Sequence, residues 1–311
     1  MEMRDYSVLI SVVHMDEYYN VDAWPQEGDK VEMTPMVKQP GGRVANTACV
    51  MSQLGDGIKF FDVLSRDATD SFLLEDLETY EINISGVSYA DGIVNSKCII
   101  ILSKKDKTCL KIVNPKPQIE LTNSQREMFY NSKYIYCAMG FHELIENSRE
   151  NFASFVKHGA RLAMDIEEGF RIDDQDYYFS LSDVLFFNQF GFLRNAELYG
   201  GEEGFLQYIF ERGVKIVALT LGKDGCKIIT PDRVIEEPAY DVKVVDPSGA
   251  GDTFNGAFLH GLINGWSLER CAKFAVGAAG YCVSTFGARS AAVSEETINK
   301  FIKENGRLCK S

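Results

Sequence analysis

The chain has 311 residues, of which 45% are hydrophobic and 25% are charged, the composition of an ordinary globular protein. Its formal net charge of −13 argues against nucleic acid and anionic membranes as partners, because both attract clustered Lys and Arg. The apolar run at residues 8–13 is too short for a membrane span or a signal-peptide core. The eight cysteines include no Cys-x-x-Cys pair, so we predict reduced thiols in a cytoplasmic protein.

The N-terminal segment predicts two strands and a helix. Residues 6–13 form a buried strand with Asp16 at its end, and residues 30–37 alternate as a second strand. The stretch Pro40–Asn46 contains two adjacent glycines and opens a helix that ends at Gly55. By themselves, these glycines indicate only a strand-to-helix turn, and the asparagine only a solvated helix residue.

The next segment predicts a second, smaller sheet. A strand at 58–63 and a helix at 70–80 come first. Two further apolar strands, at 97–103 and 109–113, are joined by a short charged segment and are typical of a hairpin. Together with residues 30–37, this hairpin would form an accessory sheet.

Strands and helices alternate from residue 134 onward. The predicted strands are 134–139, 161–166, 183–187 and 215–221, with helices near 143–158 and 203–212. This alternation predicts a parallel sheet that is covered by helices on both faces. In such sheets the ligand binds at the carboxyl ends of the strands.

Residues 246–258 are the most informative stretch of the chain. A predicted strand, Tyr240–Val245, leads into Gly249-Ala250-Gly251, and a helix follows. Glycines permit a tight turn, and the N–H groups at the start of a helix can then face an anion. Asp252 lies beside this turn. It is either a helix cap or a base that takes a proton from a hydroxyl attacking a phosphate.

Several other signatures are absent from the sequence. No Gly-x-x-x-x-Gly-Lys-Ser/Thr loop occurs, and the glycines near residue 250 do not form Gly-x-Gly-x-x-Gly. The segment His142–Glu146 lacks the second histidine of a zinc protease helix. These absences argue against a Walker-type nucleotide site, a dinucleotide dehydrogenase and a zinc protease.

Two motifs resemble a known family. Residues 246–254 read Asp-Pro-Ser-Gly-Ala-Gly-Asp-Thr-Phe, which resembles the C-terminal signature of the ribokinase (PfkB) family of carbohydrate kinases, Asp-Thr-x-Gly-Ala-Gly-Asp-x-Phe. Gly41, Gly42 and Asn46, together with Asp16, resemble the N-terminal motif of the same family. The motifs follow the family's order from residue 6 to about 295.

The resemblance implies an α/β fold that is ribokinase-like, with a doubly wound, mainly parallel sheet, helices on both faces and a small β-sheet lid. It implies a single domain over residues 1–311, with lid strands inserted at about 14–38 and 86–115. The implied enzyme is an ATP-dependent phosphotransferase that phosphorylates a hydroxyl of a sugar or sugar derivative. It would use ATP and Mg²⁺, with K⁺ as a further candidate, and could dimerise through the lid.

The resemblance also implies roles for individual residues. The implied catalytic residues are Asp252, Gly249, Ala250 and Gly251. The implied substrate-binding residues are Asp16, Gly41, Gly42, Arg43 and Asn46. The implied nucleotide-binding residues are Asn188, Thr220, Gly222, Gly225 and Gly287. The implied ligands of a monovalent cation are Asp246 and Ser248.

Two positions depart from the family pattern. Gly191 replaces the Glu of an Asn-x-x-Glu motif that begins at Asn188, which leaves the Mg²⁺ ligands open. The segment 139–141 replaces a Glu that contacts the sugar in ribokinase, which argues against a ribose-specific site. A nucleoside kinase of the same family and a non-catalytic sugar- or nucleotide-binding protein therefore remain alternatives.

Overall fold

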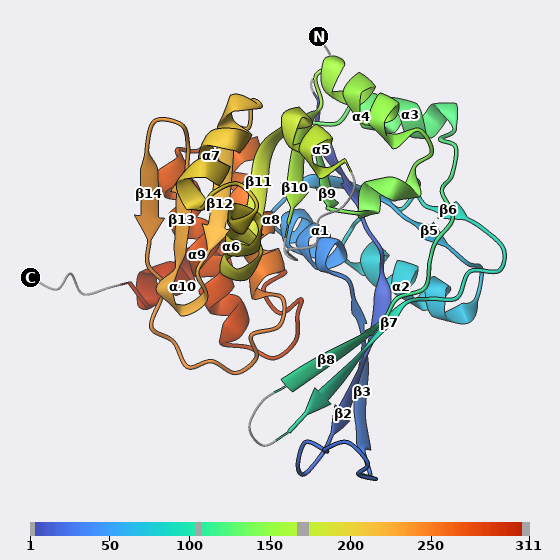
Figure 1. Ribbon diagram of the computed structural model, residues 1–311. Coiled ribbons are helices and arrows are strands. Elements are labelled where there is room, and N and C mark those ends of the chain that lie inside the picture. The colour runs from blue at the N-terminus through green and yellow to red at the C-terminus, as the bar shows by residue number, and fades with distance from the viewer. Residues whose placement is uncertain (1–3, 104–106, 167–173, 307–311) are drawn as a thin grey trace, which may run out of the picture.

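The structure is a computed structural model, described here for residues 4–103, 107–166 and 174–306 (Figure 1). Its main sheet has the strand order β14-β13-β12-β11-β10-β9-β1-β4. The strands from β4 to β12 are parallel, and β13 and β14 add an antiparallel hairpin at one edge. The bounds of these strands are β1 (Tyr6–Ile10), β4 (Gly57–Phe61), β9 (Tyr134–Ala138), β10 (Arg161–Asp165), β11 (Ser182–Asn188), β12 (Ile216–Thr220), β13 (Cys226–Ile229) and β14 (Val234–Glu237).

Helices cover both faces of this sheet. Alternate strand residues point to opposite sides, and both sides carry apolar residues that must be buried. On β1, Leu9 packs into one hydrophobic cluster, while Val8 and Ile10 pack into the other. The first cluster is covered by α1 (Arg43–Gln53), α2 (Ala68–Thr79), α8 (Ala250–Ile263), α9 (Leu268–Val283) and α10 (Glu295–Glu304). The second is covered by α3 (Asn123–Tyr130), α4 (Ser148–Lys157), α5 (Gln175–Leu181), α6 (Gln189–Glu197) and α7 (Glu202–Glu211).

A second sheet of four strands projects from this body (Figure 1). Its strand order is β3-β2-β7-β8, with β2 and β7 parallel and the outer pairs antiparallel. The bounds are β2 (His14–Asn20), β3 (Thr34–Gly41), β7 (Lys97–Leu102) and β8 (Lys107–Ile112). The remaining short elements are β5 (Val63–Leu64), β6 (Ser88–Tyr89) and the 3₁₀ turns η1 (Phe141–Leu144) and η2 (Gly222–Asp224).

The predicted α/β class, the parallel strands and the small second sheet are confirmed. The hairpin predicted at 97–113 is present as β7 and β8, although its connection at 104–106 lies outside the described residues. In the part of the chain that the structure describes, no helix has the length and apolar character that a membrane span requires.

Four predictions of local structure are wrong. The segment 240–245 is irregular, because the β13–β14 hairpin already forms that edge of the sheet, and Val244 and Val245 are exposed. The strand predicted at 30–37 is found later in the chain, as β3 at Thr34–Gly41, just before α1. It runs to Gly41, because its backbone pairs with β2 up to the register His14–Gly41.

Asp16 does not end the first strand. That strand ends at Ile10, and Asp16 lies within β2 of the second sheet. The helix predicted near 143–158 is also divided. A 3₁₀ turn comes first, and α4 begins only after Asn147, whose φ of +50° is incompatible with a continuous helix.

A buried ion pair ties the second sheet to the body. Lys116 Nζ lies 2.6 Å from Asp62 Oδ1, and their side chains are 3% and 0% exposed. Asp62 also accepts hydrogen bonds from the N–H groups of Val13 and Val63. Burial raises the pKa of the Asp62 carboxyl, and the Lys116 ammonium opposes that shift. Since Val13 precedes β2 and Lys116 follows β8, one carboxylate holds both ends of the inserted sheet.

We predict that Lys116→Met lowers the free energy of unfolding by about 3 kcal/mol, because it leaves the Asp62 charge buried without its cation. Urea unfolding followed by circular dichroism measures this loss. The matched control is Lys227→Met, which breaks an ion pair with Glu236 whose side chains are 41% and 65% exposed. Its expected cost is below about 1 kcal/mol. Equal losses in the two variants would contradict a special role for the buried pair.

Candidate active site

The turn into α8 is built around Gly249. This residue is the N-cap of α8 and has φ 76°, a left-handed conformation that favours glycine. A Cβ at this position would lie 2.1 Å from the carbonyl oxygen of Ala288, so only glycine allows the two loops to pack. The first turn of a helix carries N–H groups without intrahelical acceptors, together with the positive end of the helix dipole. The N-terminus of α8 is therefore suited to bind an anion.

A cleft of about 560 Å³ opens beside this helix start. Its lining contains Thr220 at the end of β12 and Gly222 and Gly225 of the following turn. The lining also contains Ala250 and Gly251 at the start of α8. The structure therefore brings three of the predicted nucleotide-binding residues together with two residues of the predicted anion-binding turn. Apolar side chains complete the lining, namely Val242, Val244, Phe254, Val276 and Val283.

Two predicted nucleotide-binding residues do not line this cleft. Asn188 caps α6, because its Oδ1 accepts a hydrogen bond of 2.7 Å from the N–H of Gly191. Gly287 has φ +99° and donates its N–H to Asp246 Oδ2 at 3.1 Å. Both residues therefore have a local structural partner in the protein.

Asp246 joins the loop before α8 to the loop after α9. Its carboxylate is buried and accepts the N–H of Ser248 at 2.9 Å as well as that of Gly287. The two predicted cation ligands thus lie together, next to Gly287. Each oxygen of this buried carboxylate therefore accepts a backbone N–H group.

Asp252 lies in the first turn of α8, and Gly249 rather than Asp252 is the helix cap, so the capping interpretation is wrong. Asn46 Nδ2 donates a hydrogen bond of 2.7 Å to Asp252 Oδ2. The Thr47 hydroxyl donates to the backbone carbonyl of Asp252 at 3.1 Å. Two neighbouring residues of α1 therefore fix the position of this aspartate, whose carboxylate can act as a proton acceptor.

Glycines also shape the side of the site near Asp16. A Cβ on Gly41 would lie 2.5 Å from the Asp16 carboxylate, so this aspartate requires glycine at position 41. Gly42 is the N-cap of α1 with φ 111°, and a Cβ there would lie 3.0 Å from the carbonyl oxygen of Val12. His14 Nε2 lies 3.2 Å from Asp16 Oδ1. Asp16 therefore lies against Gly41, which is followed by Gly42 at the start of α1.

Arg43 contacts groups on neighbouring elements. Its Nη1 lies 3.7 Å from Asp165 Oδ2, and its guanidinium carbon lies 5.4 Å from the centre of the Phe141 ring. The sequence analysis did not single out Asp165. The signal that could have identified it is its place as the last residue of the buried strand β10, since ligands of parallel sheets bind at that end.

Arg289 is a second residue that the sequence analysis missed. It belongs to the loop after α9, and its Nε donates a hydrogen bond of 3.0 Å to Asn46 Oδ1. Asn46 and Arg289 are far apart in the sequence, and no local motif connects them.

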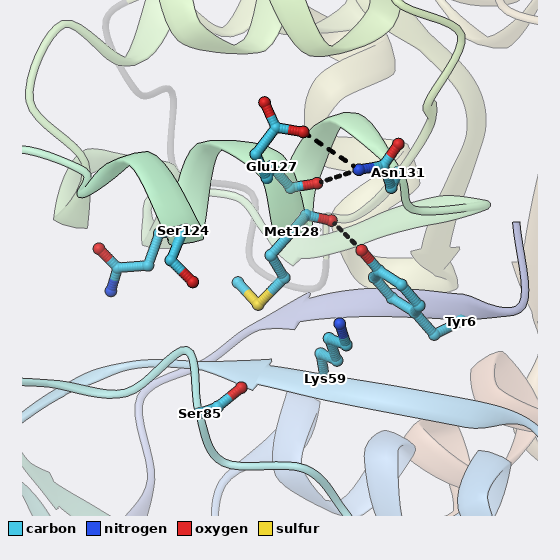
Figure 2. Close-up of a pocket in the computed structure, with 8 residues that line it drawn as sticks. Tyr6, Lys59, Ser85, Ser124, Glu127, Met128 and Asn131 are labelled. Atoms are coloured by element: carbon cyan, nitrogen blue, oxygen red, sulfur yellow. Dashed lines mark hydrogen bonds between the residues drawn. The ribbon is translucent and has the colours of Figure 1, made fainter.

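A smaller cavity of about 240 Å³ lies elsewhere, against α3 and strands β1 and β4 (Figure 2). The hydroxyl of Tyr6 donates to the carbonyl of Met128 at 2.9 Å, and Lys59 lies 3.8 Å from the centre of the Tyr6 ring. Its lining contains none of the predicted site residues. The larger cleft beside α8 is therefore the candidate active site.

The fold and this site define an ATP-dependent phosphotransferase. A family model described as pfkB family carbohydrate kinase matches residues 5–295, and the chain belongs to that family. The chain is 25% identical over 290 residues to a nucleoside kinase of Methanocaldococcus jannaschii, with 89% of each protein covered. The resemblance inferred from the sequence motifs is confirmed.

Solved structures share the fold. A ribokinase from Thermotoga maritima has a TM-score of 0.83 and 23% identity, covering 96% of this chain and 99% of that chain. A ribokinase of Arabidopsis thaliana, complexed with ribose and ATP, has a TM-score of 0.81 and 22% identity, covering 97% and 99%. The ribokinase-like architecture and its small β-sheet are therefore confirmed.

We predict that Gly249→Ala lowers kcat/KM about 100-fold, because the displaced loop moves the anion-binding turn. The matched control is Gly200→Ala, which also has a positive φ of 80° but nothing within 4 Å of the added Cβ. The control should lose about 1 kcal/mol of stability from backbone strain alone and keep its activity. Steady-state ADP release and thermal unfolding of both variants test this. Full activity in Gly249→Ala would show that the turn tolerates displacement.

Proposed function

We propose that this protein transfers the γ-phosphoryl group of ATP to a hydroxyl of a sugar or sugar derivative, with Asp252 as the general base. The observation that carries this proposal is the position of Asp252. It lies one residue beyond Ala250 and Gly251, which line the cleft, and it is hydrogen-bonded to Asn46 of α1. The carboxylate is thus placed between the proposed nucleotide cleft and the proposed acceptor residues.

The cleft suits ATP in size and chemistry. Its volume of about 560 Å³ is typical of a small-molecule site, and its apolar side chains suit a nucleobase. The phosphates would then reach the start of α8, where the N–H groups around Gly249, Ala250 and Gly251 stabilise negative charge. Thr220, Gly222 and Gly225 would line the same cleft. We propose Asn188 and Gly287 as outer residues that support this site.

In the proposed reaction, Asp252 accepts the proton as the acceptor hydroxyl attacks the γ-phosphorus. Asp16, Gly42 and Asn46 would hold the acceptor in line for this attack, with Gly41 and Arg43 beside them. Carboxylate and amide groups suit the hydroxyls of a polyol. The second sheet, as a lid, would exclude water, which otherwise competes as the acceptor.

Mg²⁺ bound to ATP would neutralise phosphate charge. The segment from Asn188 to Gly191 supplies few ligands for it. Asn188 Oδ1 is occupied as a helix cap, and Gly191 carries no side chain. Within the described ranges, no group of three or more His, Cys, Asp or Glu residues could hold a metal ion. We therefore propose that phosphate oxygens and water supply most of the Mg²⁺ ligands. A K⁺ ion near Asp246 and Ser248 is a further proposal, supported by the buried charge of Asp246.

A nucleoside is the second candidate acceptor. The relative from Methanocaldococcus jannaschii, which matches along most of the chain, is a nucleoside kinase. A non-catalytic binding protein is the third possibility, because Gly191 replaces the carboxylate expected near the metal. One assay separates these three functions.

We predict that Asp252→Asn keeps the fold and ligand binding but lowers kcat by at least about 100-fold, because an amide cannot accept the proton. ADP release from ATP and Mg²⁺ would be measured with sugars, sugar acids, sugar phosphates and nucleosides as acceptors, with and without K⁺. The matched control is Glu269→Gln, which neutralises the first-turn acid of α9 on the surface. Near-normal turnover in Asp252→Asn would refute the base assignment. Binding without turnover in the wild type would favour a binding protein.

We further propose a cytoplasmic homodimer that forms through the lid. Asp16 pairs in register with Cys98, so the next residue, Ile99, points to the opposite face of the lid. Leu110 pairs with Ile99, and Ile112 lies two residues further along the same face. The side chains of Leu110 and Ile112 are 45% and 41% exposed, so the lid face away from Asp16 is partly apolar. Free thiols in the described part of the chain support the cytoplasmic location.

We predict a mass in solution of twice the chain mass of 34.8 kDa, and a monomer for Leu110→Lys, because a charge in an apolar interface is costly. Light scattering after gel filtration measures both. Val234→Lys is the matched control, since Val234 is an exposed apolar strand residue of the main sheet. A monomeric wild type at all concentrations would exclude the lid dimer.

A further inference from the structure

Four side chains from separate parts of the chain form a continuous row of polar contacts that ends at the proposed base. Asp76 of α2 pairs with Nη1 of Arg289, and Nε of the same guanidinium donates to Asn46 Oδ1 at 3.0 Å. Asn46 Nδ2 then donates to Asp252 Oδ2 at 2.7 Å. The row runs from an acid on α2 to the proposed base on α8, through a loop residue and α1.

This arrangement allows only one orientation of the Asn46 amide. With the observed orientation, the amide oxygen faces a guanidinium donor and the amide nitrogen faces a carboxylate acceptor. A rotated amide would place its N–H groups against the guanidinium N–H and its oxygen against the carboxylate, and both contacts would be unfavourable. Arg289 therefore determines which atom of Asn46 faces Asp252.

We propose that Arg289 is a positioning residue for the phosphoryl transfer, which orients the Asn46 amide so that it holds the Asp252 carboxylate, while Asp76 anchors Arg289. This proposal rests on the proposed role of Asp252 as the base. It gives the loop after α9 a role in arranging the catalytic carboxylate.

The burial of the row supports a fixed geometry. The side chains of Arg289 and Asp76 are 9% and 24% exposed, so the guanidinium has little freedom to leave its partners. The guanidinium carbon also lies 6.0 Å from the centre of the Tyr80 ring. Burial raises the pKa of Asp76, and Arg289 opposes that shift. The planar fork of arginine can bind an acid and an amide at once, which the single ammonium of lysine does with less geometric control.

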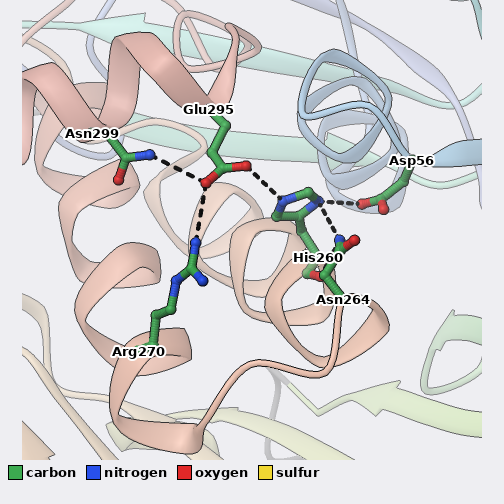
Figure 3. Close-up of polar contacts among 6 residues, drawn as sticks. All are labelled: Asp56, His260, Asn264, Arg270, Glu295 and Asn299. Atoms are coloured by element: carbon green, nitrogen blue, oxygen red, sulfur yellow. Dashed lines mark hydrogen bonds and ion pairs between the residues drawn. The ribbon is translucent and has the colours of Figure 1, made fainter.

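The first test is Arg289→Met, which keeps the length of the side chain but removes its donors. We expect kcat to fall between about tenfold and a hundredfold, the range for a hydrogen bond in a charged network, while the KM for ATP stays within about threefold. Arg270→Met is the matched control. Arg270 also pairs with a carboxylate, Glu295 at 3.4 Å, and lies over the Trp266 ring, but it belongs to a separate cluster around His260 (Figure 3). It should keep its kcat.

A purely structural role of Arg289 gives a different result. The single variant leaves Asp76 without its cation, so some loss of stability is expected in any case. The double variant Arg289→Met/Asp76→Asn removes the unpaired charge and should recover the melting temperature without recovering kcat. Recovery of kcat in the double variant would overturn the proposal, because Arg289 would then act only as a counter-ion.

Chemical rescue and a conservative variant complete the experiment. Ethylguanidinium added to Arg289→Ala should restore part of kcat, and the same addition should have no effect on Asp252→Asn. If Arg289→Met does not fold, Arg289→Lys retains the charge beside Asp76 and should fold with a partial loss of kcat. Full kcat in Arg289→Lys together with absence of rescue in Arg289→Ala would also overturn the proposal. Absence of turnover in the wild type would refute the proposed kinase function itself, which is a distinct outcome.

Discussion

The close approach of α1 and α8 is the constraint on which the site depends. Gly256 lies in the middle of α8, where a Cβ would stand 3.1 Å from the backbone oxygen of Thr47 and 3.3 Å from the side chain of Val50. A larger residue would separate the helices. Asn46 and Thr47 could then no longer reach Asp252 with the hydrogen bonds observed. A core packing contact thus sets the geometry of the proposed catalytic carboxylate.

The inserted sheet and the body meet under a similar constraint. Asp62 contacts the chain where it enters the lid, at Val13, and where it leaves, at Lys116. The same lid carries Asp16 on β2, beside the glycines that begin α1. The proposed acceptor residue Asp16 on the lid and the proposed base Asp252 on the body are therefore held in one frame, although they come from different parts of the fold. The second sheet can therefore act as a lid while Asp16 keeps its position relative to Asp252.

The sequence predicted what depends on local patterns. The alternation of strands and helices after residue 134 predicted the parallel sheet, and the Gly-Ala-Gly turn before Asp252 predicted the start of α8. Two of the failures concern long-range pairing. The end of β3 is set by its register with β2, and the irregular segment 240–245 by an edge that another hairpin occupies. Arg289 was missed because Asp76 and Asn46 are 213 and 243 residues away.

The acids around the site differ in the groups that face them. Asp165 faces the Arg43 guanidinium, and Asp246 accepts two backbone N–H groups. In the first case a cation faces the carboxylate, and in the second the backbone holds it. At Asp252, an uncharged amide stands between the carboxylate and the Arg289 guanidinium. The Asn46 amide is oriented by Arg289 and in turn orients the Asp252 carboxylate. It lies between the guanidinium and this carboxylate. An intervening asparagine can therefore link the proposed base to a guanidinium through a neutral group, which fixes the orientation of the carboxylate.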